Sequence, residues 1–230
     1  MKSLLIILLI FLPVNAFGQL FKVVKVKGSV QGQVGTSEKW IEIKEGNTLD
    51  ANTMLSTNDN SSVQLVANDL KFNLRESSAI STSAIKQMSV DELLLALALD
   101  DMMQAPKKNN DSDAKNTAVY GTNLNGNNGV FIKSNDFGIK RLNGAVQLAQ
   151  VGLRESAVAT AREIYRKYPE VKGITAYRLF FGQILVDLGL YQEAFEEYKS
   201  IQSLKLSTKE KEQVEETLEM LSKKIISEEK

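Results

Sequence analysis

The spacing of apolar residues changes near residue 89, and this change divides the chain into two parts. From residue 21 to residue 85, apolar residues alternate with polar ones or form short runs, and clusters of Gly, Asn and Asp separate the runs. Alternation with period two is typical of β-strands, and such clusters are typical of turns. The pattern predicts an antiparallel β-sandwich or small barrel over residues 19–88.

A short helix is expected to follow the strands. Ser89 and Glu92 have the spacing of a capping box, in which a hydroxyl and a carboxylate satisfy backbone amides at the start of a helix. The leucines of residues 93–99 lie on more than one helical face, which predicts burial between the two parts of the chain. We expect this connecting helix to span residues 89–104, with Asp100 and Asp101 facing solvent.

The last third of the chain repeats one helical-hairpin pattern. Gly182 and Ala194 are small enough for two antiparallel helices to approach, and Gly189 lies where the first of them would end. Gly152 and Ala157 stand 37 residues before Gly189 and Ala194. This spacing predicts two hairpins over residues 135–206.

A final helix is expected at the end of the stack. Ser207 and Glu210 form a second capping box, which predicts a charged capping helix over residues 207–227. Between the two parts, residues 105–134 are rich in Asn, Asp, Ser, Gly and Lys, a composition typical of a mobile linker. The predicted class is therefore α+β, with a β unit followed by helical hairpins.

The first part resembles the FecR-like domain family over residues 23–85. The matching pieces are Val26-Lys27-Gly28-Ser29-Val30, Trp40, Glu45-Gly46-Asn47-Thr48-Leu49, Leu55-Ser56-Thr57, Asn60-Ser61-Ser62-Val63-Gln64-Leu65, Asp69 before Phe72-Asn73-Leu74, and Glu76-Ser77-Ser78-Ala79-Ile80. The resemblance implies a β-rich sensing or binding module of the bacterial envelope, with no catalytic residues. Residues 117–122 are similar to the strand that often closes such modules, so a returning strand is expected there.

The second part resembles the tetratricopeptide repeat. The pattern is clearest from Tyr177 to Ala194, followed by Tyr198, and weaker in the preceding copy. The resemblance implies a helical surface for protein–protein interaction. Two repeats are fewer than the three or so that usually bury a continuous core, so the array is expected to need apolar surface from elsewhere.

The inner face of these repeats supplies the candidate binding residues. They are Leu142, Asn143, Val146 and Gln150 from one helix, and Leu179, Phe180, Gln183 and Asp187 from the next. This face is apolar and almost uncharged, unlike a groove that clamps a peptide carboxylate. Two alternatives follow: the face packs on the β unit or the connecting helix of the same chain, or it receives an apolar helix or strand of a partner.

The N-terminus has the pattern of an export signal. Lys2 precedes an apolar run from Leu4 to Leu12, and small-residue frames allow cleavage after Ala16 or Gly18. This run is too short to cross a bilayer, which needs about 20 residues. We expect a signal peptide at residues 1–18 and an extracytoplasmic mature protein, periplasmic or secreted, without a membrane span.

Composition removes most catalytic and metal chemistry. The chain contains no Cys and no His, which excludes thiolate nucleophiles, imidazole bases and metal centres built from those ligands. Ser83 and Lys86 match the Ser-x-x-Lys pattern of penicillin-recognising enzymes, but the companion elements are missing. We expect no catalytic residues, no cofactor and no metal.

Charge and architecture together indicate a binding protein. Lys plus Arg total 28 and Asp plus Glu total 28, so no overall field would attract nucleic acid. The expected function is non-catalytic binding or scaffolding in the bacterial envelope, with a protein as partner and cell-wall glycan as a second class. The alternative is a sensory or regulatory component resembling the FecR iron-dicitrate sensors.

Overall fold

The computed structural model describes residues 19–104, 123–124 and 130–228. The predicted signal peptide and the predicted returning strand at residues 117–122 lie outside the described residues, as does most of the predicted linker. Within the described part, no helix has both the length and the apolar character needed to cross a membrane.

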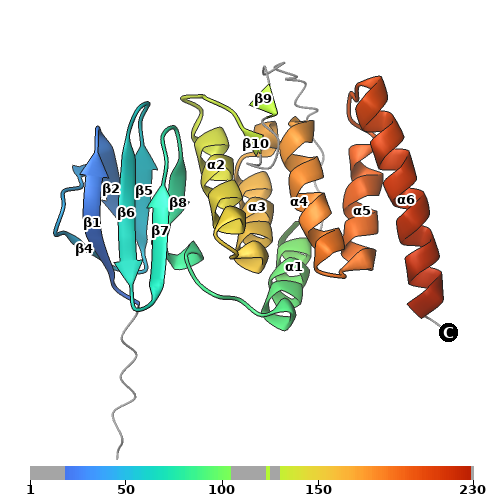
Figure 1. Ribbon diagram of the computed structural model, residues 1–230, viewed down its shortest axis with the longest axis horizontal. Coiled ribbons are helices and arrows are strands. Elements are labelled where there is room, and N and C mark those ends of the chain that lie inside the picture. Colours follow the sequence, from blue (N-terminus) through green and yellow to red (C-terminus); the bar gives the residue numbers. More distant parts are fainter. Residues whose placement is uncertain (1–18, 105–122, 125–129, 229–230) are drawn as a thin grey trace, which may run out of the picture.

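The N-terminal part is a pair of antiparallel sheets with four strands each (Figure 1). One sheet has the order β4-β1-β6-β7 and the other has the order β3-β2-β5-β8. The strands are β1 (Phe21–Lys27), β2 (Val30–Val34), β3 (Ile41–Glu42), β4 (Thr48–Leu49), β5 (Thr53–Thr57), β6 (Ser62–Ala67), β7 (Leu70–Leu74) and β8 (Ala79–Ser81). Every second residue of β5 and β6 is buried, as the alternation in the sequence predicts.

Helices form most of the rest of the described chain and continue in a row away from the sheets (Figure 1). They are the 3-10 helix η1 (Thr82–Ala84), α1 (Val90–Gln104), α2 (Phe137–Gln150), α3 (Arg154–Lys167), the 3-10 helix η3 (Pro169–Gly173), α4 (Thr175–Asp187), α5 (Tyr191–Ile201) and α6 (Thr208–Glu228). The short pair β9 (Asn123–Leu124) and β10 (Val130–Phe131) precedes α2. The mixed α+β class is confirmed.

Local signals in the sequence account for the helix boundaries. At α1, the backbone amide of Ser89 donates to Glu92 Oε2 (2.7 Å) and that of Glu92 donates to Ser89 Oγ (3.1 Å), which confirms the first capping box. The same reciprocal bonds join Ser207 and Glu210 before α6. Gly152 and Gly189 have φ of +90° and +75° in the turns after α2 and α4, a conformation that disfavours residues with a Cβ.

The β unit and the helices share one hydrophobic core, because α2 packs against β8. Gly144 allows this contact: a Cβ on this residue would lie 2.1 Å from the carbonyl oxygen of Ala79. Beside it, Gln147 Nε2 donates to Ser78 Oγ (2.7 Å), and the amide of Arg75 donates to Gln147 Oε1 (2.7 Å). The helical array therefore obtains the apolar surface that two hairpins need from the β unit.

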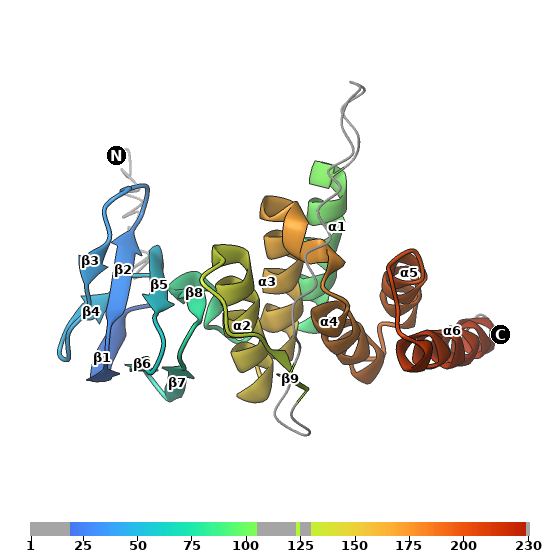
Figure 2. The same ribbon diagram turned by 90° about the horizontal axis from the view of Figure 1, so that it is seen from above.

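The position of α1 differs from expectation in two respects. This helix packs on α3 rather than between the sheets and the hairpins (Figure 2). Only Leu93, Leu97 and Asp100 of α1 are buried, so the expectation that this helix is buried between the two parts of the chain is wrong. Asp100 was expected in solvent, but Arg166 Nε of α3 donates to its carboxylate at 2.8 Å because both residues lie at the contact between the helices.

Candidate functional site

Three of the four candidate residues on α2 are enclosed by the chain itself. Leu142 and Asn143 are 0% exposed and Val146 is 1% exposed. Gln150 is exposed at the end of the helix, where its side-chain oxygen accepts a hydrogen bond of 2.5 Å from Arg75 Nη2. A partner protein therefore has no access to Leu142, Asn143 or Val146 in this fold, and for them the structure supports intramolecular packing.

Asn143 shows what occupies the inner face of α2. Its Nδ2 donates to the carbonyls of Ser77 (2.8 Å) and Ile132 (2.9 Å), and its Oδ1 accepts from the amide of Ile132 (3.3 Å). The hydroxyl of Tyr177 on α4 donates to the same Oδ1 at 2.6 Å. One buried amide thus connects the β unit, the segment after β10, α2 and α4.

The candidate residues on α4 remain closer to solvent. Leu179 and Phe180 are half-buried, and Phe180 makes an edge-to-face contact with Phe181. Gln183 and Asp187 are exposed and bond to each other, with Gln183 Nε2 donating to Asp187 Oδ1 at 2.9 Å. The eight candidates therefore do not line one open groove, because the β unit and the segment after β10 cover the α2 half.

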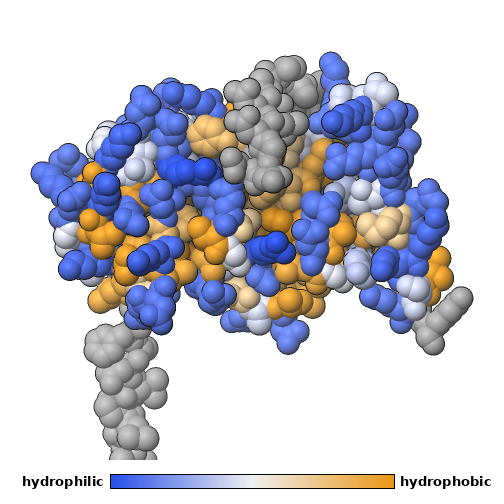
Figure 3. Space-filling model, viewed as in Figure 1, coloured by the Kyte–Doolittle hydropathy of each residue, from blue (hydrophilic) through white to orange (hydrophobic). Residues whose placement is uncertain are grey.

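A more accessible apolar surface lies on α1. We call the exposed side chains Leu95 (62% exposed), Leu99 (49%), Met102 (74%) and Met103 (60%) the α1 outer face. Residues 95, 99 and 102 follow the i, i+4, i+7 spacing of one helical stripe. Apolar surface is visible at the lower edge of the molecule, where Figure 1 places α1 (Figure 3). The sequence predicted the helix but not the exposure of these four side chains.

Contacts on the opposite side hold α1 in place. Leu93 and Leu97 are buried against the common core, and the ion pair of Asp100 with Arg166 anchors the end of the helix. The capping box defines its beginning. The α1 outer face is therefore presented by a helix that is capped at its start and held along its inner side as far as Asp100.

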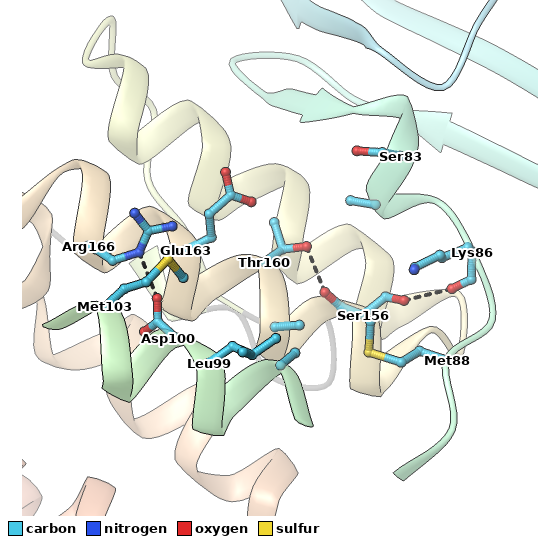
Figure 4. Close-up of a pocket in the computed structure, with 13 residues that line it drawn as sticks. Ser83, Lys86, Met88, Leu99, Asp100, Met103, Ser156, Thr160, Glu163 and Arg166 are labelled. Atoms are coloured by element: carbon cyan, nitrogen blue, oxygen red, sulfur yellow. Dashed lines mark hydrogen bonds and ion pairs between the residues drawn. The ribbon is translucent and has the colours of Figure 1, made fainter. Parts of the chain in front are cut away.

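A cavity of about 310 Å³ lies next to this face, between α1, α3 and η1 (Figure 4). Its apolar lining consists of Ala84, Met88, Ala96, Leu99, Met103 and Ala159. Charged groups surround the lining, and Arg166 with Asp100 forms one side of it. Because Leu99 and Met103 belong to both, the cavity and the α1 outer face form one continuous surface.

Glu163 is ionised at the rim of this cavity. Burial raises the pKa of its carboxyl, but the hydrogen bond from Lys167 and the charge of Arg141 outweigh that effect, so the pKa lies below its ordinary value. The carboxylate contacts Lys167 Nζ at 2.6 Å and Arg141 Nη2 at 3.4 Å. Its charge is therefore already matched by cations of the same chain.

Ser83 and Lys86 both line the cavity, but their side chains do not form a nucleophile–base pair in the described structure. Ser83 Oγ lies 2.6 Å from Ser81 Oγ, and no hydrogen bond joins it to Lys86 in the part of the chain that the structure covers. Lys86 contributes its backbone carbonyl, which accepts a hydrogen bond from Ser156 Oγ at 2.7 Å (Figure 4). Activation of a serine by lysine would need these side chains within hydrogen-bond reach.

Among residues 19–104, 123–124 and 130–228, no group of three or more acidic side chains is placed to hold a metal ion. The accessible surface of α1 and the adjoining cavity is apolar, with charged groups at its edge.

Comparisons with known proteins give no assignment. Neither a scan against protein-family models nor searches of curated proteins and of solved structures found a match.

Proposed function

We propose that this chain is a non-catalytic binding or scaffold protein of the bacterial envelope that holds a partner protein on the α1 outer face. The observation that carries this proposal is the exposure of four large apolar side chains on a helix whose other side is fixed. Scattered exposed apolar residues are ordinary on protein surfaces, whereas a contiguous patch marks an interaction site.

The energetic argument favours burial of this face in a complex. Transfer of a Leu or Met side chain from water to a packed environment contributes roughly 1.5–3 kcal/mol when burial is complete. Four such groups next to an apolar cavity can therefore provide the centre of a protein interface. A partner would gain this energy without rearrangement of the α1 backbone, so the opposing costs are those of association and of ordering the exposed side chains.

We propose further that the β unit is FecR-like and that the helices are tetratricopeptide-like. Supporting the second assignment, Gly152 and Gly189 end the first helices of two successive hairpins, and a Cβ on Gly182 would lie 3.0 Å from the ring of Tyr198. The two antiparallel sheets between residues 21 and 81 support only the β-rich fold that the first assignment implies. The N-terminal apolar segment supports export.

Crosslinking in the native host followed by mass spectrometry tests the binding function. We expect the wild-type chain to recover a protein partner that Leu95→Glu and Met102→Glu no longer recover. Ile226→Glu is the matched control, because Ile226 is also a large exposed apolar residue (58%) but lies on α6. Recovery of the same partner by all three variants would exclude the α1 outer face as the binding site.

An activity screen tests the absence of catalysis. We expect no turnover of fluorogenic peptide, ester or glycan substrates by the purified mature protein. Turnover that Ser83→Ala abolishes would overturn this part of the proposal.

A further inference from the structure

We infer that the partner bound by the α1 outer face presents a basic amphipathic helix. This inference rests on the proposed function and adds the chemistry of the partner. It follows from the shape of the apolar surface together with the charges around it.

The shape favours a helical segment. The 15 residues of α1 span about 22 Å at 1.5 Å per residue. The stripe of Leu95, Leu99 and Met102 extends over about two turns of this helix. Such a stripe pairs with the apolar face of another helix, whose anchoring side chains recur at i, i+4 and i+7. The cavity beside Leu99 and Met103 offers space for an anchoring side chain of the partner.

The charges on α1 are all negative. The helix contains Asp91, Glu92, Asp100 and Asp101 and no Lys or Arg. Asp100 is neutralised by Arg166, whereas Asp91 and Asp101 are exposed, and within the described residues neither forms an ion pair. Within the described residues, Asp91 therefore lies one turn before Leu95, at the start of the apolar stripe, whereas Asp101 lies on the flank of the helix beside Met102.

These acids favour basic residues on the partner. A second copy of the chain, paired through α1, would bring carboxylates together at the edges of the contact, which is unfavourable. An anionic membrane surface attracts Lys and Arg beside an apolar face, and α1 has neither. A helix whose Lys or Arg residues lie opposite Asp91 and Asp101 complements α1 in both shape and charge, while Lys86 and Arg166 place positive charge at the adjoining cavity.

Two synthetic helical peptides with the same leucine stripe provide the probes, one with flanking lysines and one with flanking glutamates. Fluorescence anisotropy measures their binding to the mature full-length protein. We expect the lysine peptide to bind about tenfold more tightly than the glutamate peptide, and Asp91→Lys with Asp101→Lys to reverse this preference. Leu95→Glu should weaken the lysine peptide about tenfold, and Ile226→Glu should not.

The inference is wrong if both peptides bind equally or if the aspartate reversal has no effect. Light scattering that shows a dimer, lost in Leu95→Glu, would assign the face to a second copy instead. Binding to phosphatidylglycerol vesicles that depends on Leu95 would assign it to a membrane. Thermal melts of each variant verify folding, which should be retained because Leu95, Asp91 and Asp101 are exposed.

The crosslinking experiment separates this inference from the proposed function. A partner lost in Leu95→Glu but retained after the aspartate reversal would support the proposed function and contradict the basic partner. A partner retained in both would contradict both.

Discussion

Replacement of Gly144 by alanine tests the contact between α2 and β8 most directly. A Cβ at this position would lie 2.1 Å from the carbonyl oxygen of Ala79 and 3.0 Å from its carbonyl carbon. Ordinary contacts begin at 3.4 Å, so the helix and the strand would have to separate by about 1 Å in a close-packed interior. Both obstructing atoms belong to the backbone, which cannot rotate away as a side chain can.

Two opposing effects determine whether Gly144→Ala raises or lowers the free energy of unfolding. Alanine is favoured over glycine in a helix interior by about 1 kcal/mol, so Gly144→Ala would stabilise a helix that faced open space. Overpacking of a well-filled core costs about 1–3 kcal/mol, and more when backbone must move. We expect a net loss of about 2 kcal/mol, which corresponds to a fall in the melting temperature of roughly 4–8 °C for a chain of this size.

Urea and thermal unfolding, followed by two signals, provide the measurement. Far-ultraviolet circular dichroism reports on the helices. The fluorescence of Trp40, the single tryptophan, reports on the contact between the β unit and α2, because its ring packs edge-to-face on Phe137 of α2 with 5.8 Å between the ring centroids. Gly173→Ala is the control, since a Cβ there would have no neighbour within 4 Å. Unchanged or increased stability of Gly144→Ala would refute the close approach of α2 to β8.

Three further substitutions probe the buried polar groups. Asn143→Ala should lower the free energy of unfolding in urea by about 3 kcal/mol, because it leaves several buried backbone and hydroxyl groups without partners. Glu197→Gln should cost about 3–5 kcal/mol by leaving the buried guanidinium of Arg178 unpaired, whereas Glu196→Gln, on the exposed side of α5, should change little. Burial raises the pKa of the Tyr165 phenol well above its ordinary value, so the unfolded chain loses this proton first and stability should fall as the pH rises above about 10. Tyr165→Phe should reduce this loss of stability at alkaline pH. It should not lower stability near pH 7, because the Tyr165 hydroxyl is buried without a hydrogen-bond partner among the described residues. An unchanged loss of stability at alkaline pH would contradict this assignment.

Short-range signals predicted most of the secondary structure. The capping boxes at Ser89 and Ser207 place the starts of α1 and α6 within one residue of the observed positions. The glycines at positions 152 and 189 mark the hairpin turns because their left-handed backbone is a local requirement. These features depend on a few neighbouring residues, so the sequence alone expresses them.

The candidate site was predicted less well, because exposure depends on contacts between distant segments. Asn143 has the pattern of an inner-face residue on a repeat. In the structure it is fully buried, and it donates a hydrogen bond to the carbonyl of Ser77, 66 residues away. Leucines on several sides of α1 indicate burial on several sides, but α3 covers only one of them. The sequence indicates that Asp100 faces solvent, but in the structure it forms an ion pair with Arg166 of α3.

Periodicity, caps and turn residues in the sequence determined the strands, the paired helices and the order in which they occur. Tertiary structure decided that β8 covers α2 and that α3 leaves the outer side of α1 in water. The physical reason is that an apolar residue carries the same burial energy against any neighbour of suitable shape, so its pattern identifies a face to be covered but not the segment that covers it.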